Sequence, residues 1–203
     1  MANASKNRTG AAGIGLVWLL VNAAGWGLGF GLEFAIIHTP AQGGLATLFG
    51  TLIAAGVIGL AQWLALRWLM PPLRPGSQGM AWVILTLFGF TAGFVAGAMI
   101  SSLVPEDAPA PALALTQFLS WALVGAGTGV LQWAGLKGFA RGGGWWIGSN
   151  ALGYGLGSLL LTQLRLESLA GPFTYALMGL VVGVTTLAAL ARLRRRTAPG
   201  EGV

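Results

Sequence analysis

The chain alternates between long apolar stretches and short segments that are rich in proline, glycine and charged residues. Each stretch is about as long as the ~20 residues that a helix needs to cross the hydrocarbon core of a bilayer. Because lipid offers no partner for free backbone groups, each stretch is predicted to be a transmembrane helix. The six predicted spans are about residues 13–37, 45–70, 80–103, 112–137, 144–163 and 171–191.

The composition favours a membrane protein over a soluble one. Hydrophobic residues make up 55% of the 203 residues and charged residues only 8%, whereas about 25% of a typical soluble domain is charged. A chain with so few charges could not cover its own surface in water. We therefore predict an all-α membrane protein whose residues 1–203 form a single membrane domain.

The charged residues predict the direction of the spans. With six spans, ten of the eleven lysine and arginine residues fall on one side of the membrane, which the positive-inside rule makes cytoplasmic. Both tails, at 1–9 and 192–203, then lie in the cytoplasm. The ten are Lys6, Arg8, Arg67, Arg74, Lys137, Arg141, Arg192, Arg194, Arg195 and Arg196. The net charge of +6 therefore indicates orientation, and it does not indicate binding to nucleic acid.

An internal repeat relates the odd spans to one another. Trp18, Trp82 and Trp146 are spaced by 64 residues, and glycines follow each of them at the same two intervals. The even spans repeat as well, because Gly59, Gln62, Trp63, Leu66 and Arg67 match Gly129, Gln132, Trp133, Leu136 and Lys137. Span six has Thr186 and Leu187 where Gln-Trp would fall.

The repeat predicts three tandem helical hairpins, at about 13–70, 80–137 and 144–191. Each hairpin has two spans, so all three insert the same way up. Copies with equal orientation are related by an axis along the membrane normal. A pseudo-threefold bundle is the simplest arrangement that satisfies this condition.

Glycines recur every fourth residue on the odd spans, so they lie on one face of each helix. They are Gly25, Gly29, Gly89, Gly93, Gly153 and Gly157. Small residues let helices approach closely in lipid, so the main interpretation is helix packing, with the odd spans at the bundle centre. The alternative is that the glycines leave room for a flat ligand such as a pigment or a quinone.

The Gln-Trp pairs carry the main polar groups of the even spans. Gln62 and Gln132 each precede a tryptophan, Trp63 or Trp133, close to the cytoplasmic side. One interpretation is an interfacial anchor with an interhelical hydrogen bond. The other is a polar pocket that Asn22 and Asn150 also line.

Tryptophans gather near the predicted cytoplasmic ends of the spans. We expect them to form half of an interfacial aromatic belt, as indoles often do at headgroup level. The set comprises Trp18, Trp63, Trp68, Trp82, Trp133, Trp145 and Trp146.

Glu33 is the only acidic residue inside a predicted span. Arg165 lies at a similar height on the span that copies the first, so an outer ion pair between them is predicted. A proton or cation role for Glu33 is the alternative, because acids within spans are often functional. His38, the only histidine, is interpreted as a loop residue, with ligation of a porphyrin metal as the alternative.

The glycine-rich hairpins and the helix start "GGGWWIGSNALGYGLG" resemble uncharacterised multi-pass membrane proteins of cyanobacteria and other phototrophic bacteria. The resemblance covers the first five spans. It implies no particular activity. It implies an accessory role in a photosynthetic or energy-converting membrane, and hence the bacterial cytoplasmic (inner) membrane.

The expected function is non-enzymatic. Five acids, one histidine and no cysteine leave no evident acid–base pair, catalytic site or metal site. We expect a structural or accessory subunit that binds membrane lipids and a membrane-protein partner or a second copy. Bound lipid is the expected ligand. The alternative function is a small transporter or channel with a polar path near the repeat axis.

Overall fold

The computed structural model describes residues 11–37, 44–69, 77–137, 143–164 and 171–197. Within this part of the chain the regular structure is entirely α-helical, as predicted. The helices are α1 (Ala11–Ile37), α2 (Gly44–Leu69), α3 (Ser77–Ser101), α4 (Ala110–Leu136), α5 (Gly143–Gln163) and α6 (Pro172–Thr197). Their bounds lie within a few residues of the predicted spans, apart from the longer end of α6.

Five of the six helices are long and apolar enough to cross a membrane. The sixth, α5, has 21 residues, of which six are glycine. Glycine adds length to a helix but little apolar surface, which explains why α5 falls short. The structure therefore supports a multi-pass membrane protein, as the hydropathy pattern predicts.

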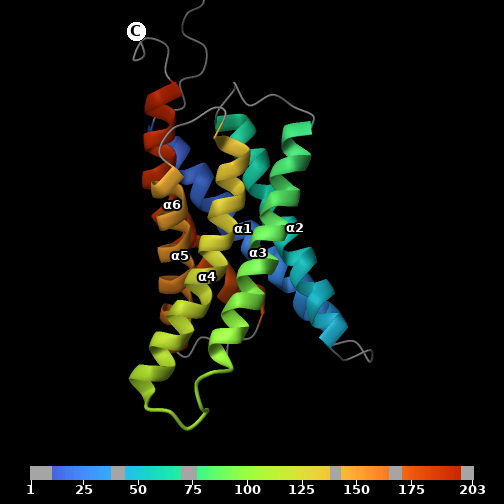
Figure 1. Cartoon of the computed structure of the whole chain (residues 1–203). Coiled ribbons are helices and arrows are strands. Elements are labelled where there is room, and N and C mark those ends of the chain that lie inside the picture. The colour runs from blue at the N-terminus through green and yellow to red at the C-terminus, as the bar shows by residue number, and fades with distance from the viewer. Residues whose placement is uncertain (1–10, 38–43, 70–76, 138–142, 165–170, 198–203) are drawn as a thin grey trace, which may run out of the picture.

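Successive helices run in opposite directions, so α1 begins and α6 ends at the same end of the bundle (Figure 1). We call this the basic end, because Arg67, Lys137 and Arg192 lie near the α2, α4 and α6 termini there. The other end is called the acidic end and carries Glu106 and Asp107, between α3 and α4. The charge asymmetry predicted from sequence is thus present among the described residues.

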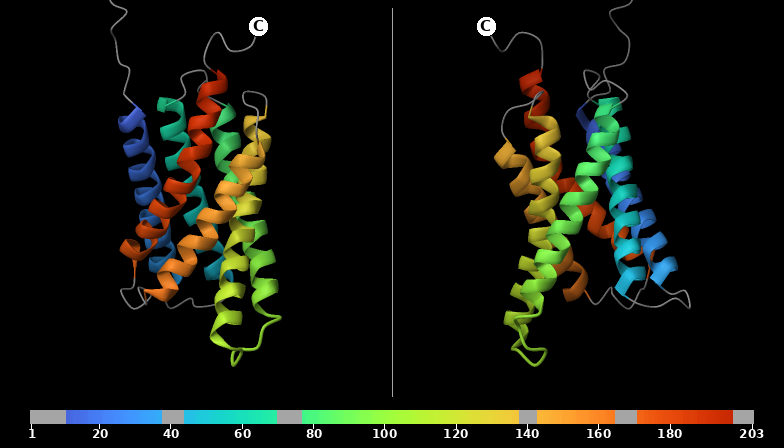
Figure 2. Two further views of the ribbon diagram at one scale, coloured as in Figure 1. Left: turned by 90° about the vertical axis from the view of Figure 1, so that its left-hand side faces the viewer. Right: turned by 45° about the vertical axis from the view of Figure 1, so that its right-hand side comes forward.

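The helices form a closed ring in chain order, and α3 and α4 lie side by side in both side views of Figure 2. Each helix packs against the helices before and after it in sequence, and α6 packs against α1. No other pair of helix backbones approaches closely within the described segments. The prediction that places α1, α3 and α5 at the bundle centre is therefore wrong for their backbones, and only their aromatic side chains meet in the interior.

The helices turn bulky apolar side chains outward. On α1, Leu16, Leu20 and Leu28 are about half exposed or more, whereas Trp18 and Trp26 are fully buried. Every other helix shows the same pattern of exposed leucine, phenylalanine or valine. A surface of this kind suits lipid, because large contiguous apolar patches are rare on soluble monomers.

Candidate functional site: the polar layer of the bundle interior

The repeated glycines lie at contacts inside each hairpin. Gly25 and Gly29 face α2, Gly89 and Gly93 face α4, and Gly153 and Gly157 face α6. A Cβ atom at Gly29 would lie 2.9 Å from the Ala54 carbonyl oxygen, and one at Gly93 would lie 2.5 Å from the Val124 Cα atom. Neighbouring helices thus occupy the space beside these glycines, which leaves no room there for a flat ligand.

The three tryptophans that are spaced by 64 residues, one on each odd helix, lie in the middle of the bundle. Trp18, Trp82 and Trp146 are at most 2% exposed. The Trp146 ring lies 6.1 Å from that of Trp18 and 6.0 Å from that of Trp82, measured between centroids. The prediction that these three belong to an interfacial belt is wrong, because the closed ring of helices turns this face inward.

A layer of hydrogen-bonded polar side chains lies next to these tryptophans. The Gln62 amide donates to the Asn22 side-chain oxygen at 2.9 Å. The Gln132 amide donates to the Gln62 side-chain oxygen at 2.8 Å and to the Thr86 hydroxyl at 3.0 Å. All four side chains are at most 1% exposed. The structure therefore brings Asn22, Gln62 and Gln132 together from three helices.

The indoles join this polar layer from one hairpin to the next. Trp146, on α5, donates to the Gln132 side-chain oxygen at 3.1 Å. Trp18, on α1, donates to the Thr186 hydroxyl of α6 at 2.9 Å. In both cases the odd helix bonds to the even helix that precedes it around the ring. Among the described residues the Trp82 N–H has no partner, although Gln62 occupies the equivalent position on α2.

Asn150 is the incomplete member of the layer. Its amide donates to the Trp146 carbonyl oxygen at 2.9 Å, as the Asn22 amide donates to Trp18. Its side-chain oxygen is buried and has no partner within the described segments. Asn22 receives its bond from Gln62 of the same hairpin, whereas α6 offers the shorter Thr186 at that position. The missing glutamine explains the missing bond.

A second aromatic layer lies one helical turn beyond the polar layer, on the odd helices. Trp26, Phe90 and Tyr154 are 0% exposed and lie in mutual contact. Their centroids are 4.7 Å apart for Trp26 and Tyr154, 6.2 Å for Trp26 and Phe90, and 6.0 Å for Phe90 and Tyr154. The polar layer thus lies between two layers of large rings.

The tryptophans of the Gln-Trp motif pack against the next helix. The Trp63 indole covers Gly79 of α3, and the Trp133 indole covers Gly143 of α5. Leu187, at the same position on α6, covers Gly15 of α1. Trp63 is only 7% exposed. Its main contact is therefore a helix contact, and its role as an interfacial anchor stays a prediction.

The remaining tryptophans at the basic end fit the predicted belt better. Trp68 and Trp145 are 61% and 60% exposed. The Arg192 guanidinium lies 3.6 Å above the centroid of the Trp145 ring. Such a cation–π contact joins the end of α6 to the start of α5.

Glu33 faces α2. The Thr51 hydroxyl donates to one carboxylate oxygen at 2.9 Å, and the Glu33 side chain covers Gly50. Arg165, the predicted partner, lies outside the described residues, as does His38. The predicted ion pair therefore stays a prediction.

Sequence reasoning missed Thr86 and Thr186 as members of the polar layer and Gly79 and Gly143 as partners of the indoles. The 64-residue spacing was the available signal, since Thr86 stands where Asn22 and Asn150 stand in their repeats. Chemically, the layer pairs amides and hydroxyls with one another between packed rings. Such an arrangement fixes the register and the choice of neighbouring helices.

Comparison with protein-family models, curated proteins and solved structures finds no match to this chain.

Proposed function

We propose that this chain is a non-enzymatic integral membrane protein that serves as a structural or accessory subunit of a larger membrane complex. Its three hairpins surround a pseudo-threefold axis along the membrane normal, all six helices cross the membrane, and both termini are cytoplasmic. The closed ring of helices supports this arrangement. So does the equivalence of Trp18 bonded to Thr186 and Trp146 bonded to Gln132.

One observation carries the functional proposal: most buried polar side chains of the polar layer bind one another. Gln132 alone takes part in three hydrogen bonds, to Gln62, Thr86 and Trp146. Groups used in this way hold helices together, and they are not free to bind a substrate. The apolar outer surface then remains as the surface that meets lipid or partner helices.

A transporter or channel with a path along the repeat axis has less support. Two layers of rings fill the space where such a path would run, the first centred on Trp146 and the second on Trp26, Phe90 and Tyr154. Replacing both Gln62 and Gln132 with leucine separates the two functions. Lost flux with unchanged assembly would favour transport, whereas lost assembly would favour packing.

The direct test is the native mass of the particle. The tagged chain is extracted from its native membrane in a mild detergent, and the purified particle is analysed by native mass spectrometry. We expect a second protein at a fixed ratio to this 20.8 kDa chain. The control is the same tag on an unrelated six-span protein of that membrane. A particle that contains only copies of this chain would overturn the accessory role.

A further inference from the structure

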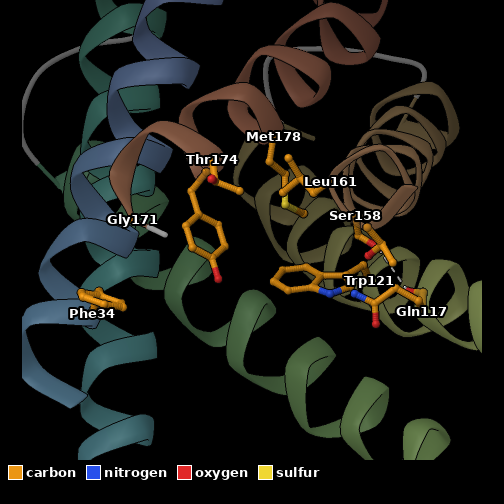
Figure 3. A pocket seen from close by; sticks show the side chains of 10 residues that line it. Phe34, Gln117, Trp121, Ser158, Leu161, Gly171, Thr174 and Met178 are labelled. Carbon is orange, nitrogen blue, oxygen red and sulfur yellow. Dashed lines mark hydrogen bonds between the residues drawn. The ribbon is translucent and has the colours of Figure 1, made fainter. Parts of the chain in front are cut away.

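A cavity of about 190 Å³ opens in the half of the bundle near the acidic end. Figure 3 shows its lining side chains, which come from α1, α4, α5 and α6. Trp121 lies in the middle of the view, Ser158 and Gln117 lie at one edge, and Leu161 and Met178 lie above. The wall thus combines apolar and polar side chains: Ser158 and Gln117 form a polar edge, and Thr174 is a polar residue on another side.

The repeat explains why there is space at this place. Phe30, Phe94 and Ser158 are spaced by 64 residues, so Ser158 stands where the first two hairpins have phenylalanine. Phe30 stacks on Tyr175 of α6, with 4.1 Å between ring centroids and an interplanar angle of 8°. The third hairpin has no ring at this position.

The stacking partner for that missing ring is nevertheless present. Trp121 precedes Gly129 by eight residues, as Tyr175 precedes Gly183. Trp121 lies on α4, the helix before α5 in the ring, as Tyr175 lies on the helix before α1. Ser158 is 3% exposed and contacts the Gln117 carbonyl oxygen at 3.5 Å, so it faces α4 as Phe30 faces α6.

We propose that a planar ring with carbonyl oxygens, the head group of a quinone, occupies this cavity and stacks on Trp121. The ring takes the place of the phenylalanine that the third hairpin lacks. Hydrogen-bond donors at the polar edge select carbonyl oxygens over a plain hydrocarbon. They are the Ser158 hydroxyl, the Gln117 amide and the Trp121 N–H.

These donors are available for a ligand. Among the described residues, neither the Gln117 amide nor the Trp121 N–H has a hydrogen-bond partner, and the Ser158 hydroxyl makes only the long contact to Gln117. Gln117 and Trp121 are half-buried, so a ligand oxygen that accepts from either donor adds a hydrogen bond that no described protein group supplies.

The size of the cavity fits one substituted ring. A dry protein cavity of about 150 Å³ can hold benzene, and this one measures about 190 Å³. A second cavity of about 300 Å³ is lined by Phe94, Gly97, Ser101 and Ser120 and shares Gln117 and Trp121 with the first. It offers space for the start of an isoprenoid tail.

The test uses the full chain in lipid nanodiscs and menadione, a tail-free naphthoquinone, with isothermal titration calorimetry as the readout. The chain has no cysteine, so menadione cannot bind covalently to a thiol. We expect one menadione per chain and weaker binding of 2-methylnaphthalene, which has the same ring system without carbonyls. Equal affinity for the two compounds would overturn the assignment to a quinone.

Ser158→Phe is the main variant, because it supplies the missing ring and should fold at least as well as the wild type. We expect its affinity for menadione to fall by at least about tenfold, roughly the value of one aromatic contact. Leu160→Phe, which adds the same ring at an exposed position of α5, should bind as the wild type does.

A second variant, Trp121→Leu, keeps the test decisive if Ser158→Phe does not fold, and it should weaken menadione binding to a similar extent. Unchanged binding in either folded variant would overturn the proposal. The accessory role is tested separately by native mass, since calorimetry on the isolated chain requires no partner protein.

Discussion

Replacing Gln132 with leucine tests whether the polar layer holds the bundle together. Gln132 donates to Gln62 at 2.8 Å and to Thr86 at 3.0 Å, and it accepts from Trp146 at 3.1 Å. Leucine has a similar size and keeps the apolar contacts but makes none of these bonds. The Trp146 N–H and the Gln62 oxygen would then lose their partners in the interior.

The loss of stability expected for Gln132→Leu follows from the number of hydrogen bonds that the substitution removes. Interhelical polar contacts in a membrane protein average ~0.6 kcal/mol, so three of them contribute about 2 kcal/mol to the free energy of unfolding. Two buried groups left without partners add to this loss, and we expect a total of about 2–4 kcal/mol. Gln62→Leu removes only the bonds to Asn22 and Gln132, so its loss should be smaller, at about 1–2 kcal/mol.

The assay is reversible unfolding in mixed micelles with increasing sodium dodecyl sulfate, followed by far-ultraviolet circular dichroism. The matched control is Gln163→Leu, the same chemical change at an exposed position near the end of α5. We expect the loss of stability to follow the order Gln132, Gln62, Gln163. A Gln132 variant as stable as the control, or one more stable than the Gln62 variant, would refute the claim that Gln132 contributes most to stability through its three hydrogen bonds.

Two further substitutions test the packing and the repeat by the same unfolding assay. Gly93→Ala should lower the free energy of unfolding by about 1–3 kcal/mol, because its methyl group would collide with the Val124 backbone. Gly56→Ala is the control, since Gly56 has open space beside it, and should change that free energy by less than ~0.5 kcal/mol. Equal effects of the two would contradict glycine-mediated packing. Thr186→Gln should stabilise the protein by roughly 0.6 kcal/mol, because a glutamine there can reach the unpaired Asn150 oxygen. The opposite result would be a destabilised Thr186→Gln variant whose effect on the free energy of unfolding simply adds to that of Asn150→Ala. It would show that the repeat does not extend to α6.

The predicted polar pocket named residues that do lie together, but the sequence did not show how they would bond. Asn22, Gln62 and Gln132 could be grouped from sequence, because their depth in the spans is similar and buried amides seek partners. The sequence could not show that the side chains would use up their bonds on one another. That outcome depends on distances between helices, and Thr86 and Trp146 enter the layer only because the helices close into a ring.

The amino-acid sequence was sufficient to predict the six helices and the helix face on which the repeated glycines lie. Long apolar stretches must satisfy their backbone groups internally, and small residues must face close contacts, whatever the neighbours are. The direction in which each tryptophan points depends on how the helices pack, which the sequence pattern does not show. An indole near a helix end is stable both at the headgroups and among other rings, so hydropathy cannot choose between them, and Trp18 and Trp82 entered the centre while Trp68 did not. The cavity beside Ser158 also depends on tertiary packing. A missing phenylalanine leaves a space only when other contacts between α4 and α5 hold these helices apart.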